Sequence, residues 1–129
     1  DFKDFPMTDF PDFAPSTMTE LMKAIKSDLS DAFSDWWRQN KTAIAGAIRT
    51  VSQSAVETQN SLLKGNISED LADIALHSQK AALRQVLRHT KLMSLVLLHS
   101  VVNTIFRRIG WALLNQTGIN FFPELIAES

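Results

Sequence analysis

The sequence predicts an all-α protein: an antiparallel hairpin of two long helices, completed by oligomerisation into a helical bundle and preceded by an extended arm. Three observations support this. Residues 17–63 contain no proline, and their apolar side chains recur every three or four positions, the period of an α-helix. Residues 68–115 also lack proline. Between them lies Lys-Gly-Asn-Ile at 64–67, which is typical of a tight turn.

Composition narrows the class of protein. A chain of 129 residues with 45% apolar content fits one folded domain. There is no cysteine, which excludes disulfides and thiolate metal sites. The net charge of −1 divides into −5 over residues 1–37 and +3 over residues 38–68, with the remainder near neutral. This asymmetry favours contact between an acidic and a basic half, within one chain or between copies, over nucleic-acid binding.

Residues 1–16 form the first predicted unit, an extended acidic and aromatic arm. Its prolines at positions 6, 11 and 15 prevent a helix. A segment of this kind is either a leader that does not fold alone or a docking arm. Four phenylalanines within thirteen residues favour docking on a partner or a neighbouring subunit. The predicted docking residues are Phe2, Phe5, Phe10 and Phe13.

The second predicted unit is the helical domain, residues 17–118. Thr17 and Glu20 have the spacing of a capping box at its start. The apolar stripe thins over residues 38–42, so a kink or break is expected near Asn40. Gly118 is expected to end the second helix, and residues 119–129 form an apolar C-terminal tail, the third unit.

The turn at 64–67 sets the hairpin. Gly65 suits a left-handed helix end, and Ser68 suits the cap of the next helix. The helices on either side, 18–63 and 69–114, are equal in length at 46 residues, or about 70 Å each. Antiparallel pairing then places residue i opposite residue 132 minus i. The predicted core inside the hairpin is Leu29, Phe33, Trp36 and Trp37.

The most apolar run, residues 92–106, lies opposite these aromatics. Its large side chains point to every side of a helix, whereas one partner helix covers only one side. A two-helix monomer would therefore expose a large apolar patch, which we expect a second copy to cover. The predicted oligomer interface is Leu92, Val96, Leu97, Val101, Ile105 and Phe106.

No enzyme motif is present: the sequence lacks a phosphate-binding glycine loop, a nucleophile elbow and a His-Glu-x-x-His pattern. Asp73 and His77, with Glu69 one turn earlier, could share a metal, but a solvated helix face is the favoured interpretation. His99 is interpreted as a core histidine that is hydrogen-bonded across an interface, with Ser100 or Asn103 in reach. We therefore predict no catalytic, cofactor-binding or metal-binding residues and no cofactor.

The predicted function is non-catalytic assembly. The chain is expected to form a homo-oligomer through its apolar helix and to dock another protein through its arm, as a virion, secretion or scaffold component. A cytoplasmic or virion-associated location is favoured, because no signal peptide opens the chain as given.

Two alternatives stay open. A membrane-active protein could insert its apolar hairpin into lipid, although residues 92–106 are shorter than a bilayer span and are followed by Arg107 and Arg108. A nucleic-acid adaptor could use a basic ridge at spacings of three and four, but the negative total charge makes nucleic acid an unlikely partner. The ridge consists of His77, Lys80, Arg84, Arg88 and Lys91.

Overall fold

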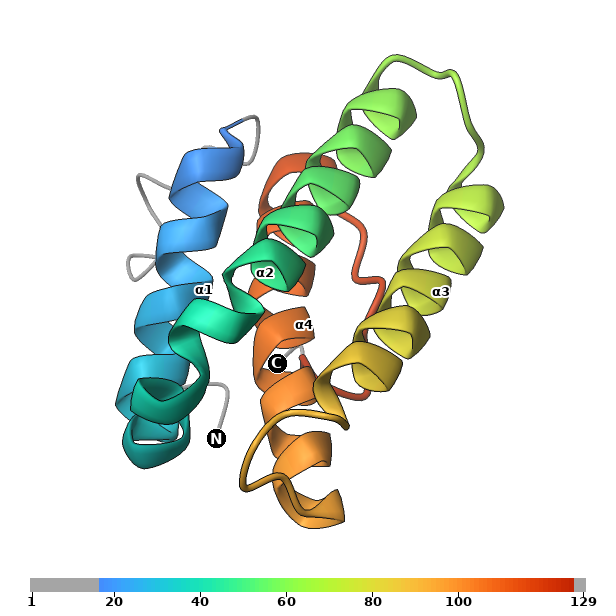
Figure 1. The fold of residues 1–129 in the computed structure, drawn as a ribbon. Helices are drawn as coiled ribbons and strands as arrows, with labels where there is room; N and C mark the ends of the chain where they lie inside the picture. The colour runs from blue at the N-terminus through green and yellow to red at the C-terminus, as the bar shows by residue number, and fades with distance from the viewer. Residues whose placement is uncertain (1–16, 127–129) are drawn as a thin grey trace.

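The computed structural model describes residues 17–126, which form a bundle of four α-helices. The helices are α1 (Met18–Ala32), α2 (Ser34–Leu63), α3 (Glu69–Leu87) and α4 (Leu95–Thr117), and they run alternately up and down (Figure 1). Helix α2 packs beside both α1 and α3, and α4 contacts all three other helices. The all-α prediction is confirmed, and residues 17–126 contain no strand. The predicted arm, with its docking phenylalanines, lies outside the described residues.

The prediction of two long helices is wrong, because each predicted helix folds back on itself. The first break lies at Phe33 rather than near Asn40: Phe33 leaves the helical conformation at φ −137° and ψ 51°. Its N–H still donates to Leu29 O and closes α1. Asn40 lies within α2 and is buried, so the thinning of the apolar stripe marks a buried polar contact and not a helix end.

The second break separates α3 from α4 at residues 88–94. Thr90 Oγ1 donates to Leu87 O at 2.7 Å, at the end of α3. Ser94 then caps α4, because its Oγ accepts from Leu97 N at 3.1 Å. Folding back at both breaks lets α1, α2 and α3 surround the apolar run, which a single straight partner helix could not do.

The turn at 64–67 is as predicted. Gly65 has a φ of +75°, in the left-handed region that glycine adopts without steric cost. Its N–H donates to Leu62 O and the Asn66 N–H donates to Ser61 O, the two bonds of a Schellman motif. Ser68 caps α3 by accepting from Leu71 N. The Thr17 side chain, by contrast, makes no capping bond at the start of α1.

The predicted intra-hairpin core gathers at the turn between α1 and α2. Leu29 and Trp36 are buried, and Phe33 and Trp37 are partly buried against the core. The connections α1–α2 and α3–α4 lie at the same end of the bundle (Figure 1). A straight hairpin would place residue 92 opposite Asn40. In the four-helix bundle Asn40 bonds to Lys91, one position away, because the two connections lie at the same end.

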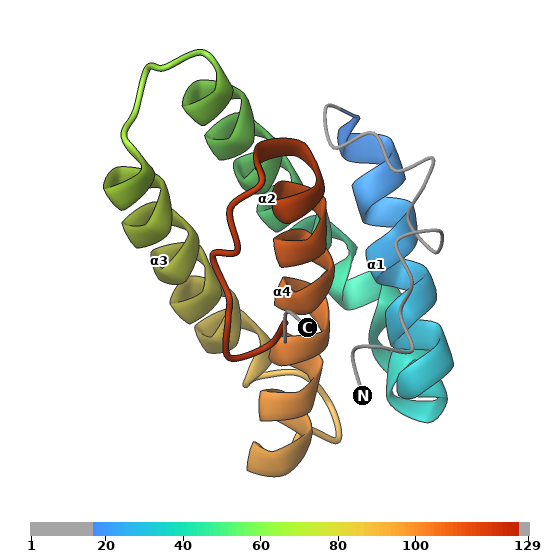
Figure 2. The same ribbon diagram turned by 180° about the vertical axis from the view of Figure 1, so that it is seen from behind.

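The C-terminal segment 119–126 turns back along the bundle between α3 and α4 (Figure 2). Gly118 ends α4 at a φ of +76°, as predicted, and reverses the chain. Phe121, Phe122 and Ile126 are buried, and Phe122 packs on Phe106 with 5.4 Å between the ring centroids. The apolar tail is therefore part of the core, where it fills the space between α3 and α4.

Candidate functional site

The predicted oligomer interface divides into a buried and an exposed part. Val101, Ile105 and Phe106 are fully buried, because they face the other helices of the same chain. Leu97 is partly buried against the core. Only Leu92 and Val96 of the predicted set remain open to solvent, at 72% and 79% exposure. The need for a second copy to cover the whole run thus disappears, and the available apolar surface shrinks to its beginning.

Leu95, at 71% exposure, lies with Leu92 and Val96 at the start of α4, and we call these three residues the apolar tip. Three large aliphatic side chains, each more than two-thirds exposed within five positions, form a cluster rather than scattered surface residues. Leu95 is absent from the interface that the sequence predicts. The signal for its exposure was Ser94, a residue type that favours the N-cap of a helix. With Ser94 as the cap, Leu95 and Val96 lie in the first turn of α4.

The backbone beneath the tip is held in place by Asn40, which is 2% exposed. Asn40 Nδ2 donates to Lys91 O at 3.0 Å and also to Trp36 O at 3.0 Å. In return, Lys91 N donates to Asn40 Oδ1 at 3.1 Å. The side chain of one buried residue in α2 therefore satisfies both backbone groups of Lys91. We call this pair of bonds the Asn40 clamp.

Leu92, the next residue, has a left-handed backbone with φ +62°, the only positive φ of a non-glycine residue among those described. This conformation costs roughly 1–2 kcal/mol for an L-residue with a bulky side chain. The clamp and the Ser94 cap hold the residues on either side and so maintain it. The result is a fixed backbone that presents apolar side chains to solvent, and strain of this kind concentrates at functional positions.

The charges near the tip are segregated. No aspartate or glutamate occurs from Ile74 to Pro123, whereas this stretch has six lysines and arginines. Arg88, His89 and Lys91 are exposed in the α3–α4 connection. At the same end of the bundle, the α1–α2 turn carries exposed Asp31 and Asp35, the latter paired with Arg38. This end of the molecule therefore has an acidic corner and a basic corner, with the apolar tip on the basic one.

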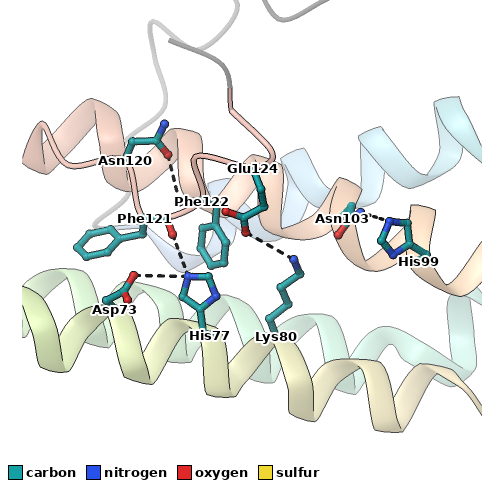
Figure 3. A network of polar contacts seen from close by, with 9 residues as sticks. All are labelled: Asp73, His77, Lys80, His99, Asn103, Asn120, Phe121, Phe122 and Glu124. Carbon is teal, nitrogen blue, oxygen red and sulfur yellow. Dashed lines mark hydrogen bonds and ion pairs between the residues drawn. The ribbon is translucent and has the colours of Figure 1, made fainter.

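The alternative metal site around Asp73 and His77 is instead a contact with the C-terminal segment (Figure 3). His77 Nε2 donates to Phe121 O at 2.9 Å, with Asp73 Oδ1 at 3.4 Å from the same nitrogen. The imidazole lies on the Phe122 ring, 4.6 Å between centroids. Since this nitrogen faces a carbonyl oxygen, it offers no lone pair to a metal. No group of three metal-ligating side chains occurs within residues 17–126.

Lys80 belongs to the same contact, so the predicted basic ridge is not a continuous free surface. Its Nζ lies 3.9 Å from Glu124 Oε1 and 5.8 Å from the centroid of the Phe122 ring (Figure 3). Arg84 remains exposed on α3, and Arg88 and Lys91 are exposed in the connection beyond the helix end. His99, predicted to be a core residue, is exposed; its Nε2 is 3.0 Å from Asn103 Nδ2.

None of the helices in the described part of the chain is sufficiently long and apolar to cross a membrane. Comparison of the chain with protein-family models, with curated proteins and with solved structures gave no match. The features of residues 17–126 that bear on function are therefore the apolar tip, its clamp and the surrounding charges.

Proposed function

We propose that this protein is a non-catalytic assembly module that associates with a second copy of itself through the apolar tip. The observation that carries the proposal is the exposure of Leu92, Leu95 and Val96 on a backbone fixed by the Asn40 clamp. When a partner covers a rigid apolar cluster, the cluster loses less conformational entropy than the same residues on a loose loop would lose. The rigid cluster therefore binds more tightly.

The size of the tip suits a weak, reversible association. Covering three aliphatic side chains that are about 70–80% exposed contributes roughly 4–6 kcal/mol per copy. In a symmetric dimer both tips are covered, which gives roughly 8–12 kcal/mol against an association cost of about 4–15 kcal/mol. The surplus is small, so we expect a dissociation constant in the micromolar range or weaker.

The charge pattern supports a two-fold arrangement of the copies. In a two-fold interface the same patch serves on both sides, which allows the acidic corner of each copy to meet the basic corner of the other. Asp31 would then face Arg88 and Lys91 of the second copy, around the two apolar tips, whereas Asp35 is already paired with Arg38 of its own chain. Such pairing contributes orientation and selectivity more than affinity.

Light scattering on a sizing column tests the proposal with the full chain at several concentrations. The parent should pass from 14.5 kDa towards twice that mass as its concentration rises. Val96→Asp should lower the average mass at a given concentration with unchanged helicity, because the side chain is exposed and an acid is favourable in the first turn of a helix. Ile74→Asp, a change at a 62% exposed residue of α3, is the matched control and should associate like the parent. A parent that is monomeric at every concentration would refute self-association.

A second candidate is reversible docking on an anionic membrane surface. Arg88, His89 and Lys91 beside an exposed apolar tip match the chemistry of such a surface, where apolar side chains enter the interface and cations contact headgroups. The acidic residues Asp31 and Asp35 at the same end oppose it. Flotation with phosphatidylserine vesicles distinguishes the two: binding that Val96→Asp abolishes, by a parent that stays monomeric, would favour the membrane.

A further inference from the structure

A second candidate binding surface is a hollow between α1 and α2. It has a volume of about 410 Å³, which falls within the range of ligand sites. Met18 and Met22 provide its apolar lining, together with Thr19. Three cations, Lys23, Lys26 and Arg49, complete it, and we call the site the cationic hollow.

The cations of the hollow are not neutralised by salt bridges within residues 17–126. None of the three forms an ion pair with another residue of the described range 17–126. Lys23 and Arg49 are exposed, and Lys26 is partly buried. Three like charges around one hollow repel one another, so a ligand that brings negative charge relieves this repulsion.

The lining favours an aromatic ligand that also carries carboxylates. Methionine side chains adapt to irregular apolar ligands and make favourable sulfur contacts with aromatic rings. Lysine and arginine contribute cation–π contacts to a ring and charge-assisted hydrogen bonds to neighbouring carboxylates. A phenylalanine flanked by aspartates has all the complementary groups.

The chain itself contains such a ligand. Residues 1–16 hold four phenylalanines and four aspartates, each phenylalanine within two positions of an aspartate, with a net charge of −3. Fully extended, sixteen residues reach on the order of 50 Å, enough to pass from one molecule to a neighbour. We propose that the cationic hollow binds residues 1–16 of a second copy, with one phenylalanine against Met18 and Met22 and its flanking aspartates on the three cations.

The position of the hollow favours an arm from a second copy over the arm of the same chain. The hollow begins at Met18, two positions beyond the arm. Thr17, the residue between them, has an extended backbone at φ −104° and ψ 108°. To enter its own hollow the arm would have to reverse direction at this point, whereas an arm from another molecule meets no such constraint. The start of α1 and the start of α4 lie at opposite ends of the bundle, so one molecule can use both surfaces at once (Figure 1).

Fluorescence anisotropy with a labelled synthetic peptide of residues 1–16 tests this inference. The acceptor is the full chain with Phe2, Phe5, Phe10 and Phe13 changed to Ala, so that its own arm does not compete. We expect saturable binding that weakens as salt is raised. A peptide with its four phenylalanines changed to Ala, and another with its four aspartates changed to Asn, should each bind at least tenfold more weakly. Equal binding of either variant peptide would overturn the assignment.

Variants of the acceptor locate the site. Lys23→Glu with Arg49→Glu should weaken peptide binding at least tenfold while the far-ultraviolet circular dichroism stays that of the parent. Lys41→Glu with Lys64→Glu, an identical charge change at exposed residues of α2 and its C-cap, is the matched control and should bind the peptide within about twofold of the parent acceptor. If both double variants lose binding equally, general charge attraction explains it and the hollow is not the site.

Two further measurements separate this inference from the proposed function of the apolar tip. An acceptor with Val96→Asp should bind the peptide normally, and loss of binding there would overturn the assignment to the hollow. In the unmodified chain, Lys23→Glu with Arg49→Glu should lower the average mass at high concentration, because arms would no longer join copies. An unchanged mass would refute binding of a second copy's arm, whatever the tip does.

Discussion

Replacing Asn40 with Ala tests whether a single buried amide fixes the backbone below the apolar tip. The side chain is 2% exposed and joins α2 to the α3–α4 connection through both backbone groups of Lys91. Asn40→Ala removes these bonds and leaves the partly buried Lys91 N–H without its partner.

The expected loss follows from the contacts. Two tertiary hydrogen bonds contribute about 0.5–1.5 kcal/mol each, and an unsatisfied, partly buried N–H adds about 1 kcal/mol. Asn40→Ala should therefore lower the free energy of unfolding by about 2–4 kcal/mol, out of a total of about 5–15 kcal/mol for a domain. Asn40→Asp, which keeps the volume and the acceptor but turns a carboxylate towards two carbonyl oxygens, should lose at least as much.

Urea unfolding followed by circular dichroism at 222 nm measures this change, and amide exchange locates it. We expect the unfolding midpoint to fall by about 1–2 M urea and the Lys91 amide to exchange at least tenfold faster. Gln39→Ala, the neighbouring exposed residue of α2, should change stability by less than about 0.5 kcal/mol. If Asn40→Ala is as stable as this control, or if the Lys91 amide keeps its protection, the clamp does not hold the tip.

Three more predictions concern the contacts that close the bundle. Asp28→Ala should destabilise the protein by about 1–3 kcal/mol in urea unfolding. The reason is that the bidentate bonds from Arg108 Nε and Nη2 to its carboxylate (2.7 and 2.6 Å) are largely shielded from water. A loss below about 0.5 kcal/mol would mean that the pair contributes no more than a surface ion pair. Phe122→Ala should lower the free energy of unfolding by about 3–5 kcal/mol, since the ring is 0% exposed. Thermal unfolding measures this loss, and an almost unchanged melting temperature would show that the C-terminal segment is not part of the core. Gly46→Ala should stabilise the protein by about 0.5–1 kcal/mol, because Gly46 is helical and a Cβ there would meet no other atom. Gly65→Ala should destabilise it by about 1 kcal/mol, because Gly65 has a φ of +75°. Changes of the same sign at both positions in urea unfolding would contradict these two expectations.

The sequence was sufficient where a local signal has one structural solution. Gly65 followed by Ser68 fixed the turn between α2 and α3, because glycine adopts the left-handed conformation without cost and serine caps the next helix. The period of the apolar residues fixed the helical class. Gly118 likewise marked the end of α4. In each case the determining interaction lies within a few residues along the chain.

The candidate site could be predicted only in part. The apolar run pointed to its location, and Leu92 and Val96 are indeed exposed. The exposed and buried members of the run differ only in which helix covers them, however, and that depends on where the chain folds back. The Asn40 clamp joins residues 51 positions apart, so no local pattern reveals it.

The tertiary structure alone decided the two breaks at Phe33 and at residues 88–94. Neither contains a proline or a glycine, and a cap residue such as Ser94 does not by itself interrupt a helix. The chain bends there because four shorter helices can surround side chains such as Leu98, Val101 and Phe106, which point to different sides of α4 and are all buried. Two straight helices would leave part of that apolar surface in water, and the free energy of burying it exceeds the loss of a few helical hydrogen bonds at each break.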